Sequence, residues 1–281
     1  MKLPPDWSTQ IEEITCPLCG YNLRGLAEPR CPECGYRFAW SEVLDRSHIH
    51  PFLFEHHPER NFRSFWRTLF AGLNPIRFWR SVLPTHEPKA WRIVIYWVLG
   101  VVLMLGGVLG AGIAAAVWEF RDSRSYPSSI LLPTLSSADI VRTMFETNRG
   151  RVLAVVASLA AILAIWPWLT VAILSIFRIS MRRARVRQSH VLRCVIYSFD
   201  GGPWAGLIAC LGFLIVPPLS GDIVHLNDTC GWIVCIAAIL WFIMSIRLAI
   251  AYRNYLKFDH PIATVAVAQF IAVLTLLAIL L

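Results

Sequence analysis

Residues 93–118 read IVIYWVLGVVLMLGGVLGAGIAAAVW, a run of 26 residues without a charged side chain. An α-helix needs about 20 apolar residues to cross the hydrocarbon core of a bilayer, so this run predicts a transmembrane helix. The composition of the 281 residues agrees, because 56% are apolar and 16% are charged, where globular proteins have about 25% charged residues. This composition excludes a disordered chain, a coiled coil and a secreted disulfide scaffold.

Four more apolar runs follow the first, at residues 152–177, 194–219, 231–250 and 261–281. Runs 152–177 and 261–281 are long enough to span outright. The other two are shorter in their uncharged parts, because Asp200 lies near the start of one and Arg247 interrupts the other. A re-entrant pair is the alternative for these two runs. We predict an all-α membrane protein with five transmembrane helices in residues 93–281.

The loops between the runs predict the orientation of the chain. Residues 178–193 hold six arginines and no acidic residue, whereas residues 220–230 hold no Lys or Arg. Since basic loops stay in the cytoplasm, we expect the N-terminus inside and the C-terminus on the opposite side. Loop 119–151 disagrees, because its five arginines then lie outside, but the other loops outweigh it. Residues 1–13 are a polar tail without the apolar segment of a cleavable signal peptide.

The basic loop also predicts a partner. A Lys or Arg next to a bilayer gains about 1 kcal/mol from anionic lipid. We therefore expect anionic headgroups near Arg178, Arg182, Arg183, Arg185 and Arg187. A nucleic-acid interface is the alternative, and the position of the loop between two spans argues against it.

Two nearly identical hexapeptides near the N-terminus carry the clearest functional signal, CPLCGY at residues 16–21 and CPECGY at residues 31–36. Each C-x-x-C pair can turn both thiolates toward one ion, and the glycine that follows permits the positive φ of a turn back toward sulfur. Two pairs supply four soft ligands in a tetrahedron, which suits zinc or iron. The expected ligands are Cys16, Cys19, Cys31 and Cys34.

Residues 14–40 are accordingly predicted to be a small β-type zinc ribbon with one Zn²⁺. So short a segment cannot build a sufficient core alone, and structural zinc supplies about 10–16 kcal/mol in comparable peptides. The expected apolar core around the metal is Tyr21, Leu23, Leu26, Tyr36 and Phe38. A disulfide is disfavoured because the segment is cytoplasmic in the predicted topology. The motif also resembles rubredoxin-like iron knuckles, but no helix carries the Glu-x-x-His pattern of a second iron site. Iron remains the alternative to zinc.

The segment between the ribbon and the membrane divides in two. Residues 41–60 read as a solvated linker with four histidines around Glu55, for which a second metal site is the alternative. Residues 61–92 read as an interfacial amphipathic segment. Here Phe62, Phe65, Trp66, Leu69, Phe70 and Leu73 share one helical face, and Arg63, Ser64, Arg67 and Thr68 share the other. Packing of this helix on the ribbon or the bundle is the alternative. Asn61 is the expected N-cap, and Asn74-Pro75 the expected stop.

From about Phe70 onward the chain resembles the Yip family of small polytopic membrane proteins. The resemblance rests on NPIRFW at residues 74–79, RCVIYS at residues 193–198 with Pro203, Trp232, and the loop 253–260 before a fifth short helix. It implies five helices with a cytosolic N-terminus. Eukaryotic relatives bind prenylated GTPases in vesicle trafficking, but the acidic cytosolic segment associated with that role is replaced here by the cysteine ribbon.

These observations predict a non-enzymatic membrane protein whose cytoplasmic zinc ribbon binds an unidentified protein partner, in membrane organisation or trafficking. A membrane-tethered redox protein with rubredoxin-like iron is one alternative. A small-solute transporter is another, with Asp200 as its carrier residue, although that residue reads more simply as a helix cap. Cys194, Cys210, Cys230 and Cys235 read as small apolar residues in or beside the spans.

Overall fold

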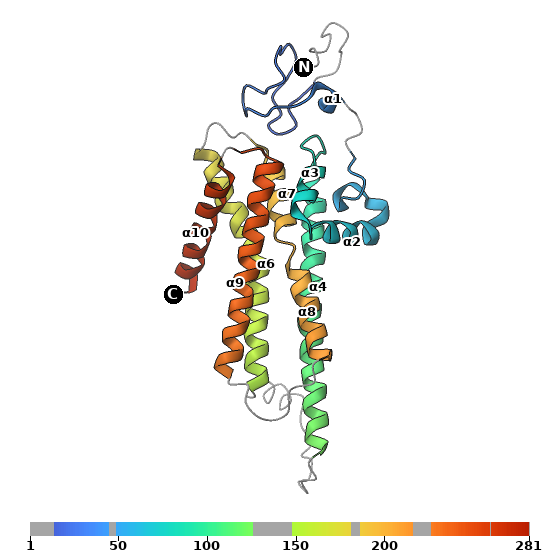
Figure 1. The fold of residues 1–281 in the computed structure, drawn as a ribbon, viewed down its shortest axis with the longest axis vertical. Helices are drawn as coiled ribbons and strands as arrows, with labels where there is room; N and C mark the ends of the chain where they lie inside the picture. The colour runs from blue at the N-terminus through green and yellow to red at the C-terminus, as the bar shows by residue number, and fades with distance from the viewer. Residues whose placement is uncertain are drawn as a thin grey trace. The chain divides into compact units, whose positions relative to one another are not determined.

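The computed structural model describes residues 14–44, 49–125, 148–180, 186–215, 226–258 and 260–280 of the chain. It is mostly helical (Figure 1). In that part of the chain no β-strand forms, and the predicted β-type ribbon is reduced to two isolated antiparallel bridges, Thr15 with Asn22 and Arg30 with Arg37. The fold class is therefore confirmed as helical, without a sheet at the N-terminus.

Short helices precede the long ones. They are α1 (Trp40–Val43), the 3₁₀ turns η1 (Phe54–His56) and η2 (Pro58–Arg60), α2 (Asn61–Ala71) and α3 (Pro75–Ser81). The long apolar helices are α4 (Ala90–Ser125), α6 (Asn148–Ser180), α9 (Leu226–Asn254) and α10 (Pro261–Leu280), with α7 (Gln188–Ser198) and α8 (Gly202–Ile215) between α6 and α9.

Four helices are long and apolar enough to cross a membrane. The candidate spans are Ala90–Ala111, Val155–Ile176, Cys235–Asn254 and Pro261–Ile279. They coincide with four of the five predicted runs, so the expectation of a membrane protein is supported. Which end of each helix faces the cytoplasm stays a prediction.

The third run, residues 194–219, is the one that differs. It begins inside α7, which ends at Ser198, and continues in α8 from Gly202. The interruption is physical, because Gly201 and Gly202 favour no helix and Pro203 is tolerated only in the first turn of a new one. Residues 194–219 therefore do not form the one uninterrupted helix that their hydropathy suggests. Among the described residues, no fifth candidate span is found.

The chain divides into two compact units, and the described residues of the second fall within Val98–Ile165 and Gly201–Ile243. Glycines set the packing of α4 on α8 in this unit. A Cβ added to Gly206 would lie 2.7 Å from both Cα and the carbonyl oxygen of Met104, and one added to Gly107 would collide with the Gly206 backbone. The two backbones touch because neither glycine has a side chain, as in other small-residue contacts of membrane helices.

The first unit falls within Met1–Trp97, Trp166–Asp200 and Met244–Leu281 and has an aromatic core. Tyr197 of α7 packs on Tyr96 of α4 and Phe78 of α3, with ring centroids 5.0 Å and 5.8 Å away. Deeper along the spans, Trp166 Nε1 donates to Gln269 Oε1 at 2.8 Å. This bond ties α6 to α10 through two buried polar groups that satisfy each other.

Helix α2 packs on this core with a different face from the one predicted. Its buried residues are Ser64, Phe65, Thr68 and Leu69, while Phe62, Phe70 and Leu73 stay exposed. Ser64 and Thr68 are buried because their hydroxyls donate to backbone carbonyls, Thr68 Oγ1 to Phe52 O at 3.1 Å and Ser64 Oγ to Asn61 O at 3.2 Å. The helix therefore packs on the bundle with half of its apolar face and exposes the other half.

Asn61 is the expected cap of α2 and Asn74-Pro75 its expected end, but α2 already ends at Ala71. Asn61 is the first residue of α2, and its Oδ1 accepts from Arg92 Nη2 at 2.5 Å. Asn74 caps α3 instead, where its Oδ1 accepts from Arg77 N at 3.1 Å.

Candidate metal centre

The two hexapeptides fold into two copies of the same turn. In the first, Gly20 N donates to Cys16 O at 2.8 Å and Cys16 N donates to Tyr21 O at 2.7 Å. In the second, Gly35 N donates to Cys31 O and Cys31 N donates to Tyr36 O, both at 2.9 Å. The glycines have φ of 80° and 71°, which confirms the prediction that positive φ is needed there. We call these turns the first knuckle (residues 16–21) and the second knuckle (residues 31–36).

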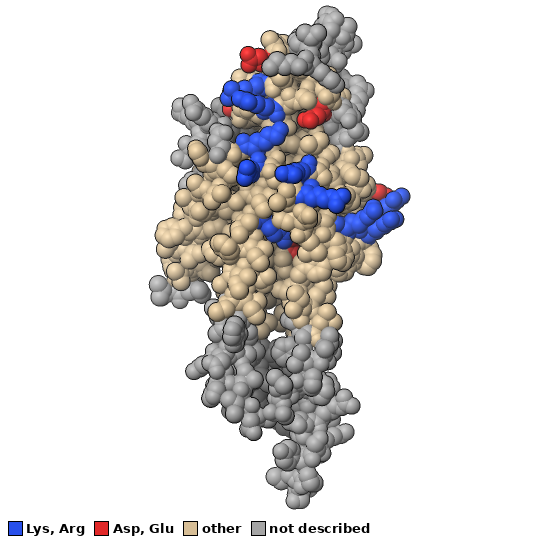
Figure 2. Space-filling model, in the orientation of Figure 1, with Lys and Arg blue, Asp and Glu red and all other residues tan. Residues whose placement is uncertain are grey.

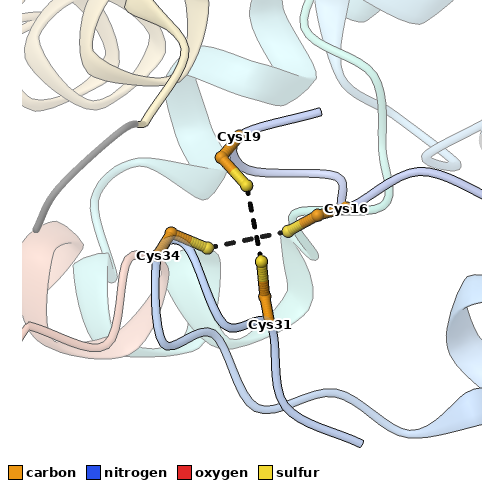
Figure 3. A group of neighbouring side chains, drawn as sticks. All are labelled: Cys16, Cys19, Cys31 and Cys34. Atoms are coloured by element: carbon orange, nitrogen blue, oxygen red, sulfur yellow. Dashed lines mark hydrogen bonds between the residues drawn. The ribbon is translucent and has the colours of Figure 1, made fainter. Parts of the chain in front are cut away.

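The knuckles bring the four predicted ligands together. The Sγ atoms of Cys16, Cys19, Cys31 and Cys34 all lie within 4.8 Å of one another and point toward a common centre (Figure 3). The two close pairs are Cys16–Cys34 at 3.6 Å and Cys19–Cys31 at 3.5 Å. These separations are far beyond the ~2.05 Å of a disulfide, so the four thiols are free. They could hold one metal ion.

The electrostatics of the cluster favour a thiolate. A hydrogen bond from the Cys34 thiol lowers the pKa of Cys16 to about 5 and raises the pKa of Cys34, because the pair shares one proton. Burial raises the pKa of Cys19 to about 12. A metal ion among the sulfurs would favour the thiolate form of its ligands.

The apolar core around the cysteines is close to the predicted one. Leu23, Tyr36 and Phe38 are buried, as expected, and Trp40 of α1 joins them edge-on to Phe38 at 4.9 Å. Leu26 is only half-buried, and Tyr21 is the error, because 38% of it is exposed. It follows the glycine of the first knuckle, whereas its counterpart Tyr36 is covered by Lys257, whose Nζ lies 5.1 Å from the ring centroid.

The first knuckle rests on the segment that leads into α7. Arg187 N donates to Leu18 O at 2.8 Å, and the Arg187 guanidinium covers Gly20 so closely that an added Cβ would lie 2.6 Å from its Nη2. The ring of His190 donates from Nε2 to Pro17 O at 2.8 Å. The carbonyls of the first knuckle are thus satisfied by α7 and the residues just before it.

The second knuckle rests on the end of α9. Lys257 Nζ donates to Arg37 O at 3.4 Å and lies over the Tyr36 ring. Lys257 has a φ of 55°, which is uncommon for a residue with a side chain. Since each knuckle contacts a different part of the bundle, a metal that joins the knuckles also joins α7 to the segment after α9.

A buried polar network continues from His190 into the bundle, and the sequence analysis missed it. Because Nε2 of His190 donates to a carbonyl, its Nδ1 must accept, and the Tyr255 hydroxyl donates to it at 2.5 Å. Arg193 Nη1 in turn donates to Tyr255 Oη at 2.8 Å. Burial lowers the pKa of His190 to about 3, which keeps the ring neutral as this chain of bonds requires.

Glu55 balances the charge of Arg193. Arg193 Nε lies 2.9 Å from Glu55 Oε1, and neither side chain has any exposed surface. Lys89 N donates to the other carboxylate oxygen at 2.9 Å. A second ion pair joins Arg247 Nη2 to Asp200 Oδ1 at 2.6 Å, and the Tyr96 hydroxyl donates to Asp200 Oδ2 at 3.1 Å. Asp200 therefore pairs with an arginine, where a helix cap was predicted.

The histidines around Glu55 are part of the core, so the solvated-linker prediction is wrong for this stretch. His50 and His56 are buried, and His50 N donates to His56 Nδ1 at 2.8 Å. Both contact His86, with ring centroids 5.0 Å and 6.0 Å away. His48 lies outside the described residues. Within those residues, the four cysteines are the one group of three or more metal-ligating side chains.

The remaining predicted residues have mixed outcomes. Arg182, Arg183 and Arg185 lie outside the described residues, as does the side chain of Arg178, so lipid contact at this loop stays a prediction. Cys194 is buried, as expected, while Cys210 is half-buried and Cys235 is exposed. A signal for the missed network exists in the sequence: Arg193 and Arg247 both border apolar runs, and a buried arginine needs a carboxylate partner.

Comparison with known proteins finds no relative of the chain. No family model matches the chain, no curated protein matches it, and no solved structure matches it. The resemblance to the Yip family therefore stays a prediction that rests on the residues quoted for it.

Proposed function

We propose that the chain is a non-enzymatic integral membrane protein, a Yip-like bundle of five helices that carries a zinc ribbon on its cytoplasmic face as an interaction module. The observation that supports it best is the convergence of four thiols beside a set of membrane-length helices. In this proposal Cys16, Cys19, Cys31 and Cys34 are structural ligands of one Zn²⁺. Four protein ligands leave no coordination position for a substrate, which favours binding over catalysis at this ion.

Zinc is favoured over iron by the rest of the sequence. Tetrahedral thiolates accept either metal, but no second redox motif accompanies the knuckles in the sequence. No segment of the chain carries the Glu-x-x-His pattern of a di-iron helix. The metal would then stabilise the segment, because so few residues bury little apolar surface on their own.

The outward surface of the ribbon would receive the partner. The inward surface is already used, since Leu18 and Pro17 bind the residues around α7 and Arg37 binds Lys257. The outward surface exposes Tyr21, Arg24 and Arg30. Tyrosine and arginine are enriched at protein interfaces, and Glu28 is exposed on the same segment, so we expect a protein partner with charges of both signs.

Proximity labelling from the N-terminus tests the interaction. Wild-type chain in its own membrane should label a defined set of cytosolic proteins, and the Cys16→Ser/Cys19→Ser/Cys31→Ser/Cys34→Ser variant should lose that set. An Arg24→Glu/Arg30→Glu variant should retain the metal yet lose the same partners. The Cys210→Ser/Cys235→Ser control keeps all four ligands and should behave like wild type. If the four-cysteine variant keeps the full set of partners, the ribbon is not the interaction module.

A further inference from the structure

Helix α2 has three different sides, and two of them carry exposed side chains. Ser64, Phe65, Thr68 and Leu69 face the bundle. At about 100° per residue, Phe62, Trp66 and Phe70 form a second stripe along the helix, and Arg63 and Arg67 form a third beside it. Phe62 is 79% exposed, Phe70 is 54% exposed, and both arginines are exposed.

The bundle-facing side of α2 packs near one end of the first candidate span. The Phe65 ring lies 5.2 Å from Tyr96, and Phe54 N donates to Thr68 Oγ1 at 2.9 Å. Tyr96 is six residues after Ala90, where the first candidate span begins, so it lies about 9 Å along the helix axis. The span of 22 residues is about 33 Å long, close to the ~30 Å of the hydrocarbon core, so α2 contacts the part of the span nearest one headgroup region.

Helix α3 continues the same surface. Leu73, just before it, is 60% exposed and Ile76 is 47% exposed, while Arg77 and Arg80 are exposed beside them. Residues 61–81 contain four arginines and no Asp or Glu. Figure 2 shows Lys and Arg side chains gathered in the region of α2 and α3 and on the four-cysteine segment, with few acidic side chains between them. Apolar and cationic stripes side by side are typical of helices that lie in a membrane interface.

We propose that α2 and α3 bind anionic phospholipid at the bilayer surface, with Phe62, Phe70, Leu73 and Ile76 among the upper acyl chains and Arg63, Arg67, Arg77 and Arg80 on the phosphates. The four arginines match the charge of the headgroups, and no acidic side chain in the segment opposes them. The residues of this surface are different from those of the basic loop at residues 178–187. It needs neither the metal nor a protein partner, so it can fail independently of the proposed function.

Hydrogen exchange of residues 61–81 tests the proposal in the full chain, reconstituted at one chain per nanodisc. In wild type, exchange should slow several-fold when phosphatidylglycerol is added to phosphatidylcholine. The Arg63→Gln/Arg67→Gln/Arg77→Gln/Arg80→Gln variant should lose this difference while exchanging like wild type in pure phosphatidylcholine. All four side chains are exposed, so folding should be unaffected.

The matched control removes exposed arginines elsewhere. Arg24→Gln/Arg30→Gln/Arg37→Gln leaves α2 and α3 intact and should keep the full phosphatidylglycerol effect. Equal exchange of wild type in both bilayers would overturn the proposal, as would an undiminished effect in the four-arginine variant. A lipid effect that arises only in discs with two chains would assign the surface to a second copy and also overturn it.

Discussion

Glu55 and Arg193 form the ion pair on which the first unit depends most. Both side chains are fully buried, and removing one partner of such a pair leaves an uncompensated charge that costs about 3–5 kcal/mol. Glu55→Ala should therefore lower the thermal midpoint of the detergent-solubilised chain by many degrees. Glu59→Ala, four residues away at an exposed position, should change it little. Equal midpoints for the two variants would show that the pair is unimportant.

His50 and His56 predict how stability depends on pH. An exposed histidine has a pKa of about 6.5. Burial lowers the pKa of His50 to about 3 and the pKa of His56 to about 4, and the charges of His86 and Arg193 contribute to these shifts. Between pH 6.5 and these lowered pKa values, the two histidines are protonated in the unfolded chain and neutral in the folded chain. Stability should be full above pH 6.5 and fall by about 1.4 kcal/mol per pH unit for each histidine as the pH drops toward 4.

Thermal unfolding across this pH range measures the effect. The His50→Gln/His56→Gln variant should show a shallower decline below pH 6.5 than wild type, whatever its stability at pH 8. His260→Gln, at an exposed position near α10, should keep the wild-type slope. A double variant with an unchanged slope would contradict the prediction.

The residues that the sequence predicted best are those whose chemistry is local. The four cysteines and the two glycines after them act within a six-residue turn, so the hexapeptide alone specifies their geometry. Glu55, Arg193 and Tyr255 could not be found in this way, because their partners lie far apart in the chain and a charged residue in a Pro-flanked segment reads as solvated. Only the packing of η1, α7 and the end of α9 brings them together.

At the scale of elements, the close contact of α4 with α8 depends on glycine, because there is no room for a Cβ atom at Gly107. A methyl group on Gly107 would collide with the Gly206 backbone, whereas one on Gly106 would meet no atom within 4 Å. Gly107→Ala should therefore destabilise the chain by about 1–3 kcal/mol through overpacking. Gly106→Ala on the same helix should be neutral or stabilising by up to about 1 kcal/mol. Chemical denaturation in detergent compares the two, and equal effects would show that the helices do not touch here.

The break between α7 and α8 shows why hydropathy overestimates helix length. Residues 194–219 are apolar enough to read as one span, but an average over the run does not register Gly201, Gly202 and Pro203, which end one helix and begin another. The sequence also could not show that Asp200, next to this break, forms an ion pair with Arg247 of α9. The face of α2 was mispredicted for a similar reason, because the carbonyls that satisfy Ser64 and Thr68 belong to its three-dimensional surroundings.

For the whole molecule, the number of spans determines where the two ends of the chain lie. Five spans place the N- and C-termini on opposite sides of the membrane, whereas the four membrane-length helices alone would place them on the same side. Reporter fusions at each end, active on only one side of the membrane, distinguish these topologies. We expect a cytoplasmic N-terminus and a C-terminus on the opposite side. Termini on the same side would mean that α8 does not cross.

The metal is the most direct test of the proposed function. Elemental analysis of the detergent-purified chain, with a visible absorption spectrum, should find one zinc per chain and no colour. The Cys16→Ser/Cys19→Ser/Cys31→Ser/Cys34→Ser variant should contain none, and the Cys210→Ser/Cys235→Ser control should retain it. One iron per chain with thiolate charge-transfer bands would contradict the zinc ribbon and assign the segment to electron transfer, and a wild-type chain without any metal would remove the ribbon altogether.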